Sequence, residues 1–209
     1  MAITILSKVL GFGREIVLSY VYGASAITDA YIISQTIPVV IFSFISAGIA
    51  TGFIPMYSRI SKAEGQLAAN KYTNNLSNAL LLLASIIVVF VLLFTQPIVK
   101  LFASGFSGET LDLAINFTRI SIFGVYFTAL ISIFSGYLQV HDNYMIPALV
   151  GIPMNLIIIA SLFISTKTNI YMLAIGSVLA TASQLLLLVP FVRKTSYKYQ
   201  PIFSLKDEH

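Results

Sequence analysis

The sequence predicts an all-α membrane protein that crosses the bilayer several times. Of its 209 residues, 57% are hydrophobic and only 10% are charged, whereas charged residues make up about 25% of an ordinary soluble domain. The mean hydropathy is +0.91, and the run ALLLLASIIVVFVLLF continues without a charge from Ala79 to Phe94. A helix satisfies its own backbone hydrogen bonds in lipid, so runs of this kind indicate membrane-spanning helices.

The sequence contains six apolar segments, and each is long enough to span a bilayer, which takes about 20 residues. The first segment, 2–22, is apolar apart from three charged residues. The second, 28–56, is interrupted by two prolines and two glycines, which predict bends. The third segment, 75–102, has Pro97 near its end.

The remaining three segments complete a predicted lobe of six transmembrane helices over 1–194. The fourth, 110–139, follows the turn-like sequence ASGFSGET. The fifth, 144–165, carries prolines in its first half, and the sixth, 170–193, ends near a proline. We expect the polar, partly aromatic residues 195–209 to form a cytoplasmic linker.

Basic residues predict how the lobe is oriented. Only Lys100 and Lys167 fall in connections on one side, whereas the other side holds Arg59, Lys62, Lys71, Arg193, Lys194, Lys198 and Lys206. The positive-inside rule therefore places the N-terminus and the tail in the cytoplasm. The net charge of +4 is small, and basic patches on a membrane protein are typical of topology or anionic lipid, so we expect no nucleic-acid partner.

Charged residues inside the apolar segments predict a functional site. Burying charge in a membrane is costly, and such residues are functional by default. At about 100° per residue, Lys8 and Glu15 fall on nearly the same helix face and Arg14 falls about 120° from Lys8. The three share a polar face only where that face lines a cavity. Arg119, roughly 13 Å into its helix, is a further candidate. This pattern favours an aqueous cavity that binds an anion.

Local explanations for these charges stay open. Lys8 lies near the start of the chain and can snorkel to the interface. Arg14 can pair with Glu15 or with Asp29, which lies at the outer mouth of the second helix. Arg119 can also snorkel outward. The sequence contains no cysteine and no cluster typical of an enzyme or metal site, so we expect no enzymatic activity and no cofactor.

Several motifs, in order along the chain, identify a family that the sequence resembles. Residues 7–15 read SKVLGFGRE, followed by YGA at 22–24 and TDAY at 28–31. GFIPMYSRISKAEG, ASGFSGE and Ile146-Pro147-Ala148 come later. Together they resemble the MurJ (MviN) family of lipid II flippases, which belongs to the MATE-like MOP superfamily. The resemblance extends over the whole chain.

The resemblance implies an architecture and a substrate. The chain would be the N-terminal lobe of a multi-pass transporter in the bacterial cytoplasmic membrane, facing a second lobe of the same protein across a cationic cavity. The substrate would be lipid II, a lipid-linked anionic glycan, moved by alternating access. Lys8 and Arg14 map onto basic residues that would bind its pyrophosphate, and Asp29 maps onto a polar position at the outer gate. With Arg119, they form the predicted substrate-binding set.

Three positions depart from the family pattern. The first basic residue is Lys8 rather than Arg, and Lys lacks the bidentate fork for phosphate. Phe42 and Ala47 stand where the family has a basic and an acidic residue. These departures favour, as an alternative, a flippase for another undecaprenyl-linked oligosaccharide. A further alternative is a membrane scaffold that does not transport. A multidrug antiporter is less favoured, because its cavity would need acidic residues.

Overall fold

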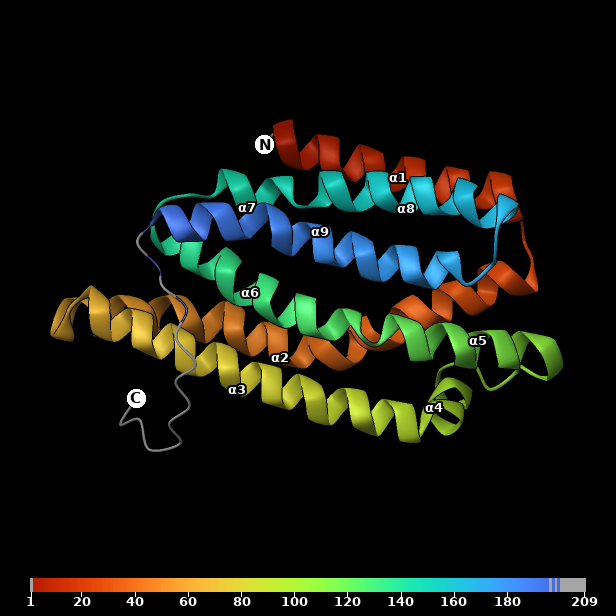
Figure 1. Ribbon diagram of the computed structural model, residues 1–209, viewed down its shortest axis with the longest axis horizontal. Helices are drawn as coiled ribbons and strands as arrows, with labels where there is room; N and C mark the ends of the chain where they lie inside the picture. The colour runs from red at the N-terminus through yellow and green to blue at the C-terminus, as the bar shows by residue number, and fades with distance from the viewer. Residues whose placement is uncertain (1, 196, 198, 200–209) are drawn as a thin grey trace.

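The computed structural model describes residues 2–195, 197 and 199, and no strand occurs among them. The helices form a bundle in which most run roughly along the long axis of the molecule, whereas one short helix, Thr95–Phe102, lies across it (Figure 1). They are α1 Ala2–Tyr22, α2 Ala26–Glu64, α3 Gln66–Leu93, α4 Thr95–Phe102, α5 Gly108–Ser121, α6 Gly124–Val140, α7 Met145–Leu149, α8 Gly151–Lys167 and α9 Met172–Lys194.

The long helix α2 and the last helix α9 organise the packing. Helix α2 contacts α5, α6 and α3, while α9 contacts α8, α6 and α5. Helix α1 lies at the edge of the bundle and packs mainly along α8 (Figure 1). Buried apolar side chains form two clusters, one at each end of the bundle. The all-α prediction is confirmed.

The boundary between the second and third helices differs from the prediction. We expected residues 58–71 to lie in a loop, but α2 continues to Glu64 and α3 begins at Gln66. Only Gly65 separates the two helices, with a φ of 88° that favours glycine. The basic residues in this region are therefore carried on helix ends. Helix α2 is 39 residues long and runs through both Pro38 and Pro55.

Three predicted segments are each divided into two helices. The third is divided at Phe94 into α3 and α4. The fourth is bent by 44° between α5 and α6. The fifth is divided at Val150, although Met145–Lys167 is continuous enough to count as a single span of 23 residues. The first and last segments match α1 and α9 to within two residues.

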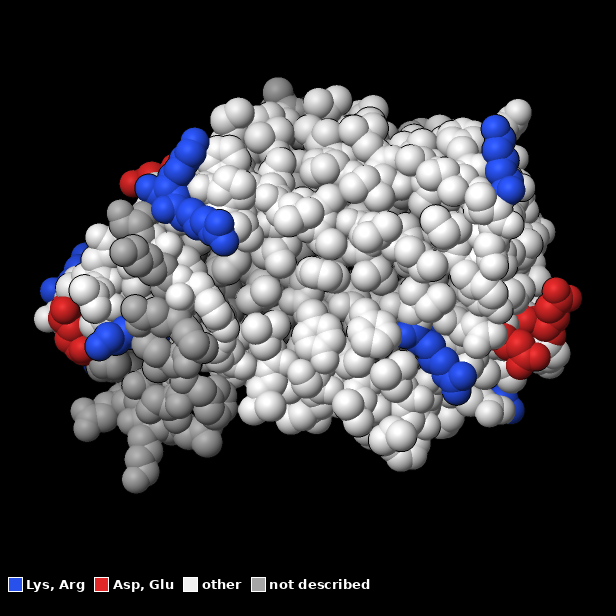
Figure 2. Space-filling view, viewed as in Figure 1, with Lys and Arg blue, Asp and Glu red and all other residues white. Residues whose placement is uncertain are grey.

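By length and composition, four helices of the described chain can cross a membrane, or five if the bent pair α5–α6 counts as one span. The predicted number of six is therefore not confirmed, because α1 carries Lys8, Arg14 and Glu15 within its 21 residues. Figure 2 shows that charged side chains gather near the two ends of the long axis, with an almost uncharged surface between them. This surface is typical of a multi-pass membrane protein.

Candidate functional site: a groove between α1 and α2

A groove of about 410 Å³ runs between α1 and α2, and side chains of α8 and α9 also line it. It exists because α1 rests on α8 and makes few contacts with α2. Charged and polar side chains reach the groove from three of its four helices. They are Arg14 and Glu15 of α1, Tyr31, Gln35 and Thr36 of α2, and Ser177 and Thr181 of α9. Aliphatic side chains and Met154 complete the lining.

Small residues allow α1 to lie close to α8. Ser7 of α1 packs directly against Gly151 of α8, where a Cβ would overlap the serine hydroxyl. One turn further along each helix, Gly11 lies beside Asn155. The Asn155 amide Nδ2 donates to the carbonyl of Ser7 at 3.3 Å and to that of Gly151 at 2.7 Å. This close contact fixes the position from which Arg14 projects.

Arg14 is the cation of the groove, and its neighbour Glu15 partly neutralises it. Nη2 of Arg14 donates to Oε1 of Glu15 at 2.5 Å, and Nε donates to the same oxygen at 3.2 Å. The side chain of Arg14 is 29% exposed and that of Glu15 is 53% exposed. A guanidinium has five N–H donors, so donors on Arg14 remain for an anion in the groove.

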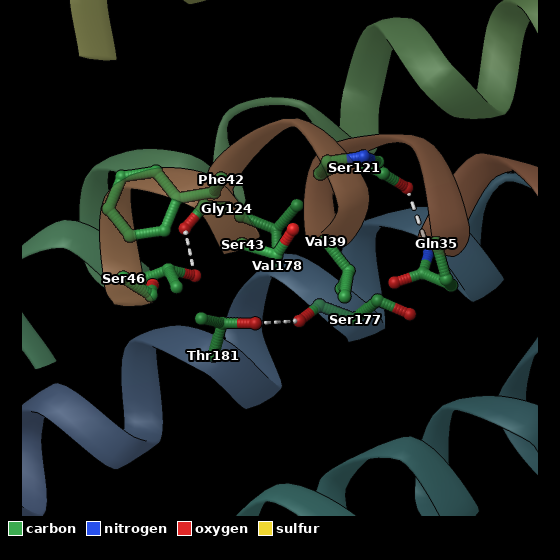
Figure 3. A pocket seen from close by; sticks show the side chains of 12 residues that line it. Gln35, Val39, Phe42, Ser43, Ser46, Ser121, Gly124, Ser177, Val178 and Thr181 are labelled. Atoms are coloured by element: carbon green, nitrogen blue, oxygen red, sulfur yellow. Dashed lines mark hydrogen bonds between the residues drawn. The ribbon is translucent and has the colours of Figure 1, made fainter. Parts of the chain in front are cut away.

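A second, hydroxyl-rich pocket of about 310 Å³ adjoins the groove (Figure 3). The two share the lining residues Gln35, Val39, Ser177 and Thr181, so they are direct neighbours. Hydroxyls reach the pocket from α2, α5, α6 and α9, and the residues that carry them are Ser43, Ser46, Ser121, Thr128, Ser177 and Thr181. Phe42 covers part of its wall.

Two hydrogen bonds between helices hold the polar side chains in place. Gln35 Nε2 donates to Ser121 Oγ at 2.9 Å, which joins α2 to α5 (Figure 3). The hydroxyls of Tyr31 and Ser177 lie 2.7 Å apart and join α2 to α9. Tyr31 and Ser177 are almost fully buried. Gln35 donates its hydrogen bonds through Nε2, so its side-chain carbonyl oxygen can accept a hydrogen bond from a ligand.

A third pocket, of about 240 Å³, continues the polar lining along α2. It shares Ser46 with the second pocket and is bounded by α2 and α6. Ser132, Ser135 and Gln139 of α6 line it. Polar side chains therefore follow α2 from Tyr31 to beyond Ser46.

The structure separates the four predicted site residues. Arg14 lines the groove. Lys8 is exposed on α1 and Arg119 is exposed on α5, and neither lines a cavity reported above. Asp29 is exposed in the first turn of α2, where a carboxylate stabilises the positive end of the helix dipole. The four residues therefore do not form a single cluster in this conformation.

Sequence reasoning missed most of the polar lining. Gln35 gives only a weak signal in the sequence, because polar residues in membrane helices commonly bond to a neighbouring helix. The serines and threonines of α9 gave no signal, because hydroxyls in membrane helices usually bond to the preceding turn. Thr181 does so here, donating to the carbonyl of Ser177 at 2.9 Å. Only their position facing α2 makes these residues part of the site.

Taken together, the groove and its pockets can hold a ligand that has an anionic group and an uncharged polar group. Arg14 supplies the charge-assisted donors for the anion. Gln35 and the hydroxyls of α9 supply donors and acceptors for the polar part. No group of three or more histidine, cysteine, aspartate or glutamate side chains suited to a metal ion occurs among the described residues.

Comparison with known proteins gives consistent matches. The sequence pattern of the family described as lipid II flippase MurJ matches residues 18–209. The probable lipid II flippase MurJ of Buchnera aphidicola subsp. Acyrthosiphon pisum is 31% identical over 96% of this chain and 40% of its own length. The lipid II flippase MurJ of Thermosipho africanus is 27% identical over 94% of this chain and 41% of its own length.

A solved structure supports the same assignment. The lipid II flippase MurJ in an inward closed conformation superposes with a TM-score of 0.81 at 27% sequence identity. The match covers 96% of this chain and 43% of the solved chain. The chain thus spans about two fifths of the length of the proteins that it matches.

Proposed function

Because the chain belongs to the lipid II flippase MurJ family, we propose that it forms the N-terminal lobe of a flippase that moves lipid II across the bacterial cytoplasmic membrane. The observation that carries the proposal is Arg14, a cation on an apolar helix that lines a polar groove. A flippase needs such a group, because the pyrophosphate of its substrate must be stabilised inside the bilayer. No covalent chemistry is required.

The proposal includes a topology. Residues 1–194 form a lobe of six spans, with α5–α6 as one bent span and α1 as a span in which Arg14 and Glu15 line the groove. Residues 195–209 form a linker toward a second lobe of the same protein. The basic ends of α2, α3 and α9 lie in the cytoplasm with the N-terminus. This assignment is supported by Arg59, Lys62 and Lys71, which cluster at the α2–α3 turn.

The proposed substrate site centres on Arg14. Its free donors would bind the pyrophosphate in charge-assisted hydrogen bonds. Lys8, Asp29 and Arg119 complete the proposed set, although they lie outside the groove in this conformation. We propose that they meet the substrate at other stages of transport, with Lys8 on the cytoplasmic side and Asp29 at the outer gate. Transport then follows from differential binding of the substrate to inward-open and outward-open states.

Replacement of Arg14 in the full-length protein tests this proposal. When the variant is the only copy of the flippase in the cell, we expect Arg14→Ala to abolish lipid II flipping. Arg14→Lys keeps the charge but loses the fork geometry, so part of the activity should remain. The measurement is lipid II exposed on the outer leaflet, normalised to the amount of flippase in the membrane.

Arg59→Ala is the matched control, because Arg59 is an exposed arginine of α2 outside the groove. It should leave flipping unchanged. Normal flipping by the Arg14→Ala variant would overturn the assignment of the groove as the substrate site.

A second substrate is favoured by one specific observation. Phe42, at a position where the family resemblance implies a basic residue, is 3% exposed and lines the hydroxyl-rich pocket. Ala47 stands where the resemblance implies an acidic residue. With fewer charges along α2, the cavity would also suit another undecaprenyl-linked oligosaccharide.

Depletion of the full-length protein distinguishes the candidate functions. Accumulation of lipid II inside the cell supports the first proposal. Accumulation of a different lipid-linked glycan supports the second. If no precursor accumulates but wall-synthesis proteins lose their location, the protein acts as a scaffold, and both transport proposals are wrong.

A further inference from the structure

An apolar groove of about 680 Å³ lies further along α9, toward its C-terminal end, than the Arg14 groove. Helix α6 forms its floor through Leu130 and Phe134, and α3 and α9 form its walls. It shares no residue with the groove and pockets along α2. Its volume is within the range of about 300–1,000 Å³ that is typical of ligand sites.

The sides of this groove face hydrocarbon. On α3, Leu82 and Ile86 next to the groove are 52% and 59% exposed, and on α9 Leu186 is 72% exposed. Large apolar side chains are exposed in this way where a helix contacts lipid. A molecule that enters the groove sideways therefore comes from the bilayer.

The α9 wall presents apolar side chains followed by a cationic one, an order that complements the acyl chain and the anionic headgroup of a phospholipid. Leu185, Val189 and Arg193 follow one another at intervals of four residues and thus lie on one face of the helix. The two apolar residues match an acyl chain, and the guanidinium at the end of α9 matches a headgroup phosphate. Arg193 makes no ion pair with a described residue.

Two tyrosines close the same end of the groove. Tyr197 donates to Asn74 Oδ1 at 2.6 Å, and Tyr199 donates to Asn78 Oδ1. These hydrogen bonds attach both tyrosines to α3. Their side chains therefore line the groove. Among the described residues of the lining, Arg193 is the one that carries a charge, so this part of the groove combines a positive charge with an apolar interior.

We propose that this groove binds an anionic phospholipid, with an acyl chain between α3 and α9 and the headgroup phosphate against Arg193. The binding is separate from transport, because the site and the Arg14 groove share no lining residue. A basic pocket between transmembrane helices is the kind of site that selects an anionic headgroup over a zwitterionic one.

Fluorescence quenching by brominated phospholipids tests the proposal in the full-length flippase. The described chain has no tryptophan, so Leu185→Trp adds a reporter inside the groove, and Leu186→Trp adds one on the exposed face beside it. Each variant is reconstituted in mixed phosphatidylcholine and phosphatidylglycerol vesicles in which one of the two lipids carries brominated chains. The signal is the quenching difference from the parent protein.

At Leu185→Trp we expect phosphatidylglycerol to associate about fivefold more strongly than phosphatidylcholine, the preference that one basic residue gives near the membrane surface. At Leu186→Trp the two lipids should quench equally. Adding Arg193→Gln to Leu185→Trp should bring the ratio close to one, while Arg193→Lys and Arg59→Gln should preserve the preference.

Three outcomes would overturn the proposal. The first is equal quenching by both lipids at Leu185→Trp. The second is a preference that persists in Arg193→Gln. The third is a tryptophan at this position that no brominated lipid reaches, which would mean that protein fills the groove. Since the assay measures no flipping, failure here leaves the proposed transport function unaffected.

Discussion

The hydroxyl of Ser7 on α1 occupies the space that a Cβ on Gly151 of α8 would take. A side chain at position 151 would require the Ser7 hydroxyl to rotate away and the two helices to move slightly apart. The contact fixes α1 on α8 and leaves the Arg14 groove open toward α2. It predicts that substitution at Gly151 disturbs the position of Arg14 although the two residues do not touch.

Gly151→Ala is therefore expected to destabilise the protein. Adding a methyl group to a close-packed contact costs about 1–3 kcal/mol, which should lower the midpoint of thermal unfolding of the full-length protein. Gly13→Ala is the control, because nothing lies within 4 Å of a Cβ at that position. Combining Gly151→Ala with Ser7→Gly should restore part of the lost stability. If the two alanine variants unfold at the same temperature, the close contact is not tight in solution.

Glu15→Gln is expected to strengthen binding of a lipid-linked pyrophosphate. The carboxylate now accepts two hydrogen bonds from Arg14 and opposes the approach of an anion. Removing its charge should tighten binding by several-fold at low salt, and the difference should shrink as salt is added. The measurement is the dissociation constant of the purified full-length protein. Glu109→Gln, at the exposed start of α5, should have no effect.

Gln35→Leu should reduce transport with little loss of stability. A hydrogen bond between membrane helices contributes about 0.6 kcal/mol on average, so losing the bond from Gln35 to Ser121 lowers the unfolding midpoint only slightly. Flipping should fall by a larger factor, because the side chain lines both the groove and the hydroxyl-rich pocket. Gln96→Leu, on the exposed surface of α4, is the control. Equal losses of stability and flipping would mean that Gln35 has only a structural role.

Tyr197→Phe should loosen the segment that follows α9. The ring of Tyr197 is 5% exposed, and its hydroxyl donates to Asn74, so loss of the bond should cost about 1 kcal/mol. Hydrogen exchange of the α3 backbone near Asn74 measures the effect. Tyr199→Phe, at an exposed residue, should change exchange less.

Alkaline pH should have a similar effect on this contact. Burial raises the pKa of Tyr197 to about 12, above the value of about 10 for an exposed tyrosine. The folded state therefore holds this proton more strongly than the unfolded state, and its stabilising effect is present below pH 10. Stability should fall as the pH rises from about 10 to 12. The Tyr197→Phe variant should lose less stability over this range, and an identical decline in both proteins would contradict the assignment.

Arg14 could be found from the sequence because a charge in an apolar segment is rare and costly. The same argument selected Lys8 and Arg119, which lie outside the groove, since a helical wheel gives relative angles but not the direction of the neighbouring helices. The packing of α1 against α8 decides that direction, and it depends on small residues about 140 positions apart. Local patterns in the sequence do not specify such a contact.

The residues after α9 show a similar limit. Their composition predicts a polar linker, and residues 196, 198 and 200–209 lie outside the described part of the chain. Tyr197, however, is buried and bonds to Asn74 of α3. The tyrosine pairs there with an asparagine more than a hundred positions earlier in the chain. Both residues are polar, so the sequence does not indicate that they form a buried hydrogen bond with each other.

The length of α2 has a mechanical consequence. Gln35, in the Arg14 groove, and Tyr57, which packs on Tyr137 of α6, belong to one continuous helix and lie roughly 33 Å apart along it. A movement of α2 as one body that widens the groove around Gln35 would also displace Tyr57. The ring contacts of Tyr57 with Tyr137 and His141 would therefore oppose such a movement.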